Sequence, residues 1–296
     1  MQSFGQTKIK MKAVLSDYLE LTKPPIMFLL LITASGGMFL AQGGVPNLWL
    51  ILAVWLGGAT ASGGASALNH YWDRDIDLLM TRTSNRPVAA KRVSGPAAII
   101  FGVSLNVISM VVLLLWVNWL AAALTLGATL FYVLIYTMWL KRTTPQNIVI
   151  GGAPGSIPPV VGWVAVTGSF DLSALFLFAI VFFWTPAHFW PLSIMIEKDY
   201  EKVKVPMLSV VAPIDYTVLS IFLYTLIVVS LTIVFAFTGV TGLIYLVSAV
   251  ILGVVFIYFA WNLKKAKSII KARHQYLYSL LYLMVLFCSF MIDALI

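Results

Sequence analysis

Nine continuous apolar runs, each about as long as a helix that crosses a bilayer, dominate this sequence of 296 residues. They cover residues 25–42, 48–68, 97–117, 120–140, 148–167, 172–195, 216–237, 242–263 and 276–295. A spanning α-helix needs about 20 apolar residues, so these runs predict nine transmembrane helices. Charged residues make up only 10% of the chain, against about 25% in soluble globular domains. We therefore predict an all-α, polytopic membrane protein.

The basic residues support this count of spans. All 19 lysines and arginines fall in the N-terminal segment or in the loops after the second, fourth, sixth and eighth runs. The nine-span arrangement puts every one of them on the same side, which the positive-inside rule makes cytoplasmic. We expect residues 1–24 to form a cytoplasmic N-terminal segment and residues 25–296 a single transmembrane domain. Residues 14–23 form either a short surface helix or a solvated lead-in.

This charge distribution also bears on location and partners. The net charge of +8 resides in membrane-flanking loops, so it predicts contact with membrane lipids and no nucleic-acid partner. We expect an integral, multi-pass protein of a prokaryotic cell membrane, with its polar site facing the cytoplasm.

An acidic cluster follows the second run. Asn69, Asp73 and Asp77 are four residues apart, so they share one face if the helix continues past Asn69. Like charges at this spacing destabilise a bare helix, and a divalent cation is the simplest compensation. Mg²⁺ usually takes one or two carboxylates together with water and substrate phosphate oxygens. The alternative is a solvated loop balanced by nearby arginines.

A second acidic cluster follows the sixth run and contains Glu197, Asp199 and Glu201. Two acidic sites at one membrane surface suit a substrate with a polyanionic head and an apolar tail, bridged through Mg²⁺. A diphosphate leaving group fits this pattern because positive charge is needed where negative charge develops. The residues expected to contact the diphosphate are Arg82, Arg86, Lys141, Arg142, Asn147, Lys198 and Lys202.

At these residues the sequence resembles the UbiA superfamily of intramembrane prenyltransferases. The Asn-x3-Asp-x3-Asp spacing from Asn69 is similar to the first metal-binding motif of that superfamily. Three stretches resemble its haem-modifying branch: DLLMTRTSNRPVA at 77–89, YTMWLKRTTPQNIVIGGAPGSIPP at 136–159 and WTPAHFWPLSIMIEKDYEKVKVPML at 184–208. The similarity extends from about residue 23 to the last span. The second superfamily motif, commonly Asp-x3-Asp-x3-Gly, is absent, and Lys204 stands where a glycine is often found.

The resemblance implies a fold of nine helices and a specific reaction. Farnesyl diphosphate ionises with Mg²⁺ taking up charge, a vinyl group of haem b attacks the farnesyl carbon, and water captures the resulting cation. The product would be haem O, a step toward haem A, so haem A synthase and oxidase assembly proteins are expected partners. Metal ligands would be Asp73, Asp77 and acids of the second cluster, and which of those acids bind metal stays open.

Three histidines and one glycine-rich stretch are further candidates. His188 lies inside the sixth run, where an ionisable residue is a functional candidate by default, and histidine commonly ligates haem iron. The alternative for His188 is a hydrogen bond to a neighbouring helix. His70 and His274 are weaker candidates for haem contact. Residues 151–159 contain three glycines and three prolines, which predicts a break in the fifth span that lines a cavity.

Two other functions are compatible with the same spans. A transporter would have broken helices in two related halves, whereas this chain has one clear break and no evident repeat. Its acids also lie at one surface rather than near the membrane midplane. A prenyltransferase of the same fold with a quinone or chlorophyll-type acceptor is the nearer alternative.

Overall fold

The computed structural model describes residues 13–296 and confirms the prediction of nine apolar helices within that part of the chain. The spans are Pro24–Gln42, Leu48–Trp72, Gly95–Trp116, Trp119–Thr143, Asn147–Thr167, Leu172–Met195, Ile214–Ala236, Leu243–Ala266 and Ile269–Asp293. Single helices form seven of them, namely α2, α3, α5, α10, α13, α14 and α15. Lys8, Lys10 and Lys12 of the predicted N-terminal segment lie outside the described residues.

The fourth and fifth spans are each composed of several helical segments. The fourth comprises α6 (Trp119–Leu130), the π-helix η1 (Phe131–Leu140) and α7 (Lys141–Thr143). The fifth comprises α8 (Asn147–Gly151), the short 3₁₀ helix η2 (Pro154–Ser156) and α9 (Ile157–Thr167). The break predicted in the fifth span is therefore present. The π-helix was not predicted, because an apolar run gives no sign of the local hydrogen-bond register.

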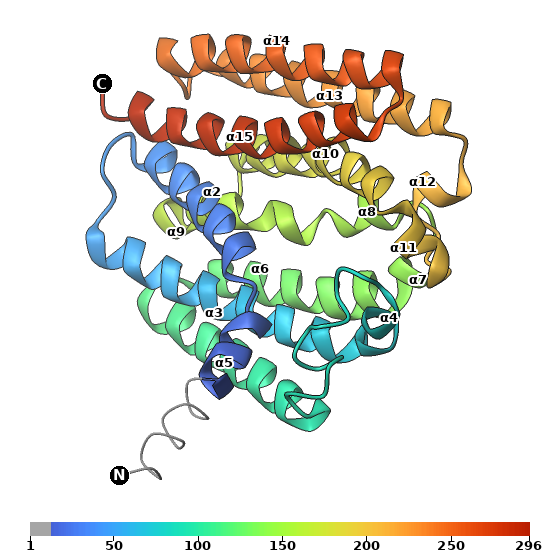
Figure 1. Ribbon diagram of the computed structural model, residues 1–296. Coiled ribbons are helices and arrows are strands. Elements are labelled where there is room, and N and C mark those ends of the chain that lie inside the picture. Colours follow the sequence, from blue (N-terminus) through green and yellow to red (C-terminus); the bar gives the residue numbers. More distant parts are fainter. Residues whose placement is uncertain (1–12) are drawn as a thin grey trace, which may run out of the picture.

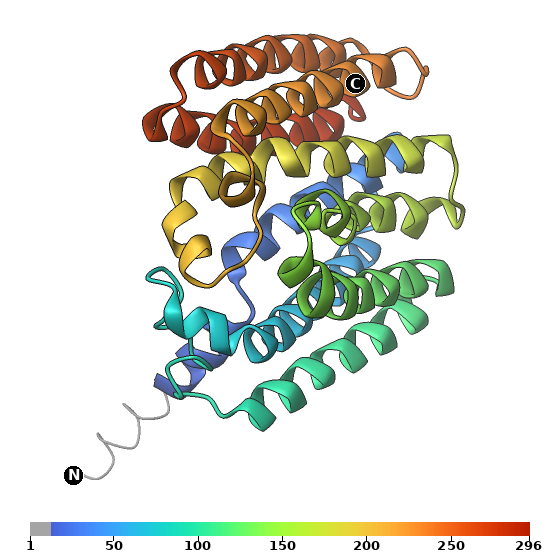
Figure 2. The same cartoon turned by 90° about the vertical axis from the view of Figure 1, so that its right-hand side faces the viewer.

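The bundle consists of two groups of helices with α2 running between them (Figures 1 and 2). The most extensive contacts in the first group join α3 to α5, and those in the second join α10 to α13 and α14 to α15. Helix α2 packs against α9 of the broken fifth span and against α15 of the second group. The largest apolar core lies around α2, α9, α10, α13 and α15, so α2 links the two groups.

Side-chain caps mark the start of several spans. A polar side chain accepts a hydrogen bond from the first-turn backbone of α3, α5, α6, α10 and α15, at Asn47, Ser94, Asn118, Asp171 and Ser268. Such caps satisfy amide groups that lack a partner within the helix. The cap at Ser268 also explains why the last span begins seven residues before the predicted 276. Its basic first turns extend the helix beyond the apolar run.

Short elements gather at one end of the bundle, where α3 and α10 end; we call this the acidic end. They are α4 (Arg74–Leu79), α11 (Glu197–Lys202) and α12 (Leu208–Val211), on the right in Figure 1. A separate apolar cluster joins α4 and α11, the segments that carry the two acidic clusters. It contains Ile76 and Met80 at α4, Tyr200 in α11 and Met207 in the loop after α11. This packing brings the two acidic segments together.

Residues 13–21 form a helix that packs against α3, the loop before α5 and the start of α5. Leu21 is fully buried with Ala67, Val88 and Ala98, and Arg92 pairs with Asp17 at 2.7 Å. The surface-helix alternative for this segment is thus the one observed.

Glycines allow α2 and α9 to approach closely. A Cβ atom placed on Gly162 would lie 2.0 Å from the carbonyl oxygen of Ala34, and one on Gly37 would lie 2.2 Å from that of Pro159. Both contacts are with backbone, which cannot rotate away. Small residues at such crossings are a common means of helix association in membranes, where apolar burial gives little net attraction between helices.

Gly162→Ala is therefore expected to destabilise the fold by about 1–3 kcal/mol, the usual cost of overpacking. The matched control is Gly127→Ala in α6, since a Cβ there would meet nothing within 4 Å. Thermal unfolding in detergent can be followed with a thiol-reactive fluorophore, because Cys288 is the single cysteine. Equal unfolding temperatures for the two variants would contradict this account of the α2–α9 contact.

Candidate active site

Asp73 lies at the junction of α3 and α4. Helix α3 continues past Asn69 to Trp72, and the amide of Asp73 still donates to the carbonyl of Asn69 at 2.9 Å. The side-chain amide of Asn69 donates to Oδ2 of Asp73 at 2.7 Å. Asp73 and Asp77 are almost entirely buried, at 0% and 1% exposure. The structure therefore places Asn69 and Asp73 together, as the spacing predicts, whereas the third residue of the pattern, Asp77, lies in α4 and is bound by Arg86.

Lys141 neutralises the buried carboxylate of Asp73. Its Nζ lies 2.5 Å from Oδ2 of Asp73, and its side chain is only 12% exposed. Lys141 directly follows the π-helix η1, whose Thr137 accepts a second hydrogen bond from Asn69 at 3.1 Å. π-Helical turns are rare and often occur at functional sites. Here the π-helix supplies two groups of the network around Asp73.

Lys23 is a site residue that the sequence analysis missed. It precedes the two prolines that open α2, has a positive φ of 51°, and donates from Nζ to Oδ1 of Asn69 at 2.9 Å. Burial of the ammonium group and the nearby charge of Arg86 lower the pKa of Lys23 to about 7. The available signal was the position of this lysine, immediately before a Pro-Pro pair at the start of a span.

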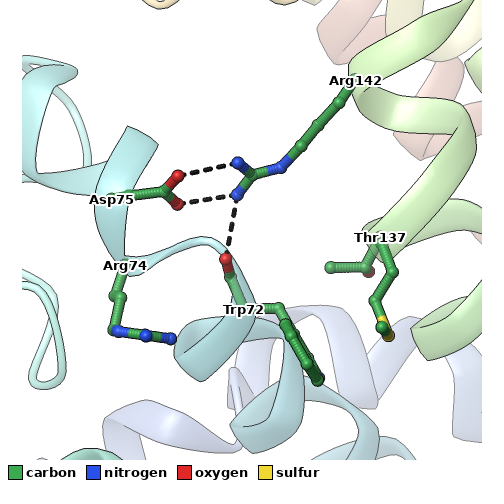
Figure 3. Close-up of a pocket in the computed structure, with 6 residues that line it drawn as sticks. Trp72, Arg74, Asp75, Thr137 and Arg142 are labelled. Atoms are coloured by element: carbon green, nitrogen blue, oxygen red, sulfur yellow. Dashed lines mark hydrogen bonds and ion pairs between the residues drawn. The ribbon is translucent and has the colours of Figure 1, made fainter.

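Two arginines bind acids of the first cluster. Arg86 contacts both carboxylate oxygens of Asp77, at 2.9 and 2.8 Å. Arg142 binds both oxygens of Asp75 at 2.7 Å and the carbonyl of Trp72 at 2.9 Å (Figure 3). The hydrogen bonds from Arg142 lower the pKa of Asp75. Two of the three arginines expected at a diphosphate, Arg86 and Arg142, are thus at the acidic end and already paired with a carboxylate.

A cavity of about 370 Å³ lies beside the Arg142–Asp75 pair (Figure 3). Its lining residues are Trp72, Arg74, Asp75, Thr137, Met138 and Arg142. Thr137 connects it to the network of Asn69, but Asp73 and Asp77 are not among the lining residues. The cavity is therefore adjacent to the buried acids and does not contain them.

In the second acidic cluster, Asp199 contacts the loop that follows α4. Its carboxylate accepts hydrogen bonds from the backbone amides of Thr81 and Arg82, at 3.2 and 3.3 Å. Partial burial raises the pKa of Asp199, but these amides outweigh burial and the net shift is downward. The two acidic segments therefore meet through Asp199 and the backbone rather than through facing carboxylates.

The remaining predicted residues differ in accessibility. Exposed side chains include Glu197, Glu201, Arg82, Lys198 and Lys202. Asn147 is fully buried instead, and its amide donates to the carbonyl of Thr144 at 2.7 Å. Its Oδ1 is buried with no hydrogen-bond partner among the described residues. Because that free group is an acceptor, Asn147 suits a metal ion or water better than a phosphate oxygen.

The carboxylate of Asp73 fits Mg²⁺ bound together with a phosphate, whereas both oxygens of Asp77 are bound by Arg86. Oδ1 of Asp73 is buried and accepts no hydrogen bond within residues 13–296, and its nearest cation is the Arg142 guanidinium at 4.0 Å, so a lone pair is available. In the same part of the chain, no three His, Cys, Asp or Glu side chains could enclose a metal by themselves. Mg²⁺ does not require such a cage, since one or two carboxylates, water and substrate phosphates complete its shell.

The three histidines occupy different environments. His70 is 2% exposed, and neither of its ring nitrogens has a partner among the described residues. His188 lies within α10 and bonds Ser279 of α15 at 2.7 Å. His274 is exposed near the start of α15, beside Phe259.

The Lys141–Asp73 pair makes a testable contribution to stability. Lys141→Met should lower the free energy of unfolding by about 3–5 kcal/mol, because it removes the ammonium group 2.5 Å from a buried carboxylate and leaves only Arg142, at 4.0 Å, to balance its charge. Lys198→Met is the matched control, since Lys198 is exposed. Thermal unfolding in detergent without Mg²⁺ would measure both variants. Equal stability would show that the ion pair does not compensate Asp73.

Comparison with known proteins identifies the family. The model of the UbiA prenyltransferase family matches residues 30–288. Protoheme IX farnesyltransferase from Gloeobacter violaceus is 49% identical, with 96% of this chain and 94% of that protein covered. The protein of the same name from Chloroflexus aurantiacus is 45% identical over 96% of this chain. This chain spans about half of the Chloroflexus protein, 49% of its length.

Solved structures share the fold. Digeranylgeranylglyceryl phosphate synthase superimposes with a TM-score of 0.78 at 18% identity, covering 95% of this chain and 98% of that one. A UbiA homologue from Archaeoglobus fulgidus, bound to GPP and Mg²⁺, gives a TM-score of 0.62 at 15% identity, covering 93% and 99%. The family match covers most of the sequence and the structural match extends over the bundle, so this chain belongs to the UbiA prenyltransferase family.

Proposed function

We propose that this protein transfers the farnesyl group of farnesyl diphosphate to a vinyl group of haem b, forming haem O. The observation that carries this proposal is the 49% identity, over nearly the whole chain, to a protein named protoheme IX farnesyltransferase. The buried acids at the end of α3 supply the chemistry expected of a prenyltransferase. Haem b and farnesyl diphosphate are then the two substrates.

The residues around Asp73 would hold the diphosphate through Mg²⁺. Asp73 and Asp77 supply carboxylate oxygens, and the exposed Glu197 and Glu201 can supply others from the second cluster. When bound, Mg²⁺ stabilises the negative charge that develops on the departing diphosphate. Asn69 fixes the orientation of the Asp73 carboxylate through its 2.7 Å hydrogen bond.

Basic residues at the acidic end would neutralise the remaining phosphate charge. Lys141 pairs with Asp73, and Lys23 bonds Asn69, so both ammonium groups are next to the carboxylate that would bind metal. Arginine can add bidentate contacts to phosphate. The arginines and lysines proposed for this role are Arg82, Arg86, Arg142, Lys198 and Lys202.

The reaction needs no nucleophile from the protein. The bond between the farnesyl carbon and the diphosphate oxygen breaks with both electrons passing to oxygen. A vinyl carbon of haem then bonds to that farnesyl carbon, which leaves a cation on the other vinyl carbon. Water adds to this cation and releases a proton, giving the hydroxyethylfarnesyl side chain.

The orientation of the protein follows from the basic loops. We propose that the acidic end faces the cytoplasm, because the positive-inside rule applies to the loops beside α3 and α10. Water-soluble diphosphate would then be released to the cytoplasm of a prokaryotic cell. The product is a substrate for haem A formation, and we propose haem A synthase or oxidase assembly proteins as its recipients.

Removing either buried acid should abolish most activity. Asp73→Asn and Asp77→Asn are expected to lower kcat/KM by about 100-fold or more, because each removes a charged oxygen donor from the metal site. Asp215→Asn is the control. Asp215 lies in the first turn of α13 and pairs with Lys267, so it belongs to neither acidic cluster. Haem O formed from haem b, farnesyl diphosphate and Mg²⁺ would be quantified by chromatography. Full activity of Asp73→Asn would remove the metal assignment.

The acceptor can be identified separately from the prenyl donor. With one labelled farnesyl diphosphate, purified protein should transfer label to haem b and not to phenolic acids, quinone precursors or chlorophyll precursors. Addition of EDTA should stop the transfer, and excess Mg²⁺ should restore it. Label found only on a phenolic acid would replace the haem assignment with the alternative acceptor class.

A further inference from the structure

His188 lies where α10 faces the interior of the bundle. Thr185, His188 and Leu192 of α10 are partly accessible at helical spacing, as are other residues of this helix such as Phe182 and Phe189. Thr185 lies against Gly152 of the broken fifth span, whereas His188 lies against α15. Thr185 and His188 therefore lie beside neighbouring helices.

Two aromatic rings and one hydrogen bond fix the imidazole. Trp184 stacks on it with a centroid distance of 4.3 Å and an interplanar angle of 10°. Tyr276 of α15 stacks on it at 4.9 Å and 25°. Nδ1 lies 2.7 Å from the hydroxyl of Ser279. The indole of Trp184 also donates to the Ser279 carbonyl at 2.9 Å, which holds the two helices together at this point.

The hydrogen bonds of Ser279 determine the tautomer of His188. The Ser279 hydroxyl donates its single proton to the carbonyl of Tyr276 at 2.6 Å, so it must accept from Nδ1 of His188. Nδ1 then carries the hydrogen, and Nε2 of the neutral ring has a free lone pair.

Nε2 is the remaining polar atom of this ring. Among the described residues it makes no hydrogen bond, and the His188 residue is partly accessible. This differs from His70, whose two ring nitrogens are both buried. A metal-binding histidine characteristically donates its other N–H to a fixed acceptor, which orients the ring. His188 has this arrangement, and it belongs to no group of His, Cys, Asp or Glu side chains within residues 13–296 that could hold a metal.

We propose that Nε2 of His188 ligates the iron of the haem acceptor. This inference rests on the proposed function and adds the residue that positions its second substrate. His188 is seven residues before the end of α10, about 10 Å into the span from the acidic end at 1.5 Å per residue. The iron would then lie deeper in the bundle than the diphosphate, and the planar apolar ring would occupy the interior beside α10.

The test uses the full-length protein in nanodiscs, titrated with haem b in the absence of farnesyl diphosphate. The ferrous wild-type complex should show an iron–histidine stretching band by resonance Raman spectroscopy. His188→Ala should lose this band, and added imidazole should restore it. His188→Met should shift the Soret spectrum toward thioether ligation, while His274→Ala should leave it unchanged. Ser279→Ala should weaken haem binding by about tenfold, the usual cost of losing such an orienting partner.

The possible failures of the two proposals are distinguishable. If His188→Ala keeps the iron–histidine band while the wild type converts haem b to haem O, the ligand assignment is wrong and the proposed function stands. If the wild-type protein neither binds nor farnesylates haem b, the proposed function itself is wrong. Restoration by imidazole, or a changed spectrum in His188→Met, shows that the variants retain a folded haem site.

Discussion

The buried carboxylate of Asp73 is the interaction on which the rest of the structure depends. An ionised group out of contact with water is costly unless it is paired and hydrogen-bonded. Asn69 supplies the hydrogen bond and Lys141 the charge, and these come from different spans. The end of α3 and the π-helical fourth span are therefore held at fixed positions by one acid, and Lys23 joins them through Asn69 to the start of α2.

The contacts that hold the helices together and the polar groups of the candidate active site lie in different parts of the bundle. Close contact between α2 and α9, through Gly37 and Gly162, fixes the middle of the bundle, where apolar side chains suffice. The polar groups are concentrated at the acidic end, where Asp199 joins the two acidic segments through the backbone of residues 81 and 82. A substrate with a charged head and an apolar tail matches this division between a polar end and an apolar interior.

Hydrophobic run length and charge placement were sufficient to predict the nine spans, and residue spacing predicted that Asn69 and Asp73 share a face. The sequence could not reveal the π-helix, which places Thr137 and Lys141, because an apolar run reads the same whether its backbone hydrogen bonds are α-helical or π-helical. It also missed Lys23, since a lysine before a span ordinarily indicates topology alone. The contact between Asp199 and the backbone amides of Thr81 and Arg82 depends on how α4 and α11 pack together. Local sequence patterns do not predict such tertiary packing.

The most direct measurement is an experimental structure of the protein with a farnesyl thiodiphosphate analogue and Mn²⁺ in place of Mg²⁺. Anomalous scattering would locate the metal independently of the lipid. The account predicts a metal peak within coordination distance of Asp73, with the diphosphate between it and the neighbouring basic side chains. A head group bound elsewhere, with Asp73 still paired to Lys141 and not to metal, would contradict the central role given to this acid.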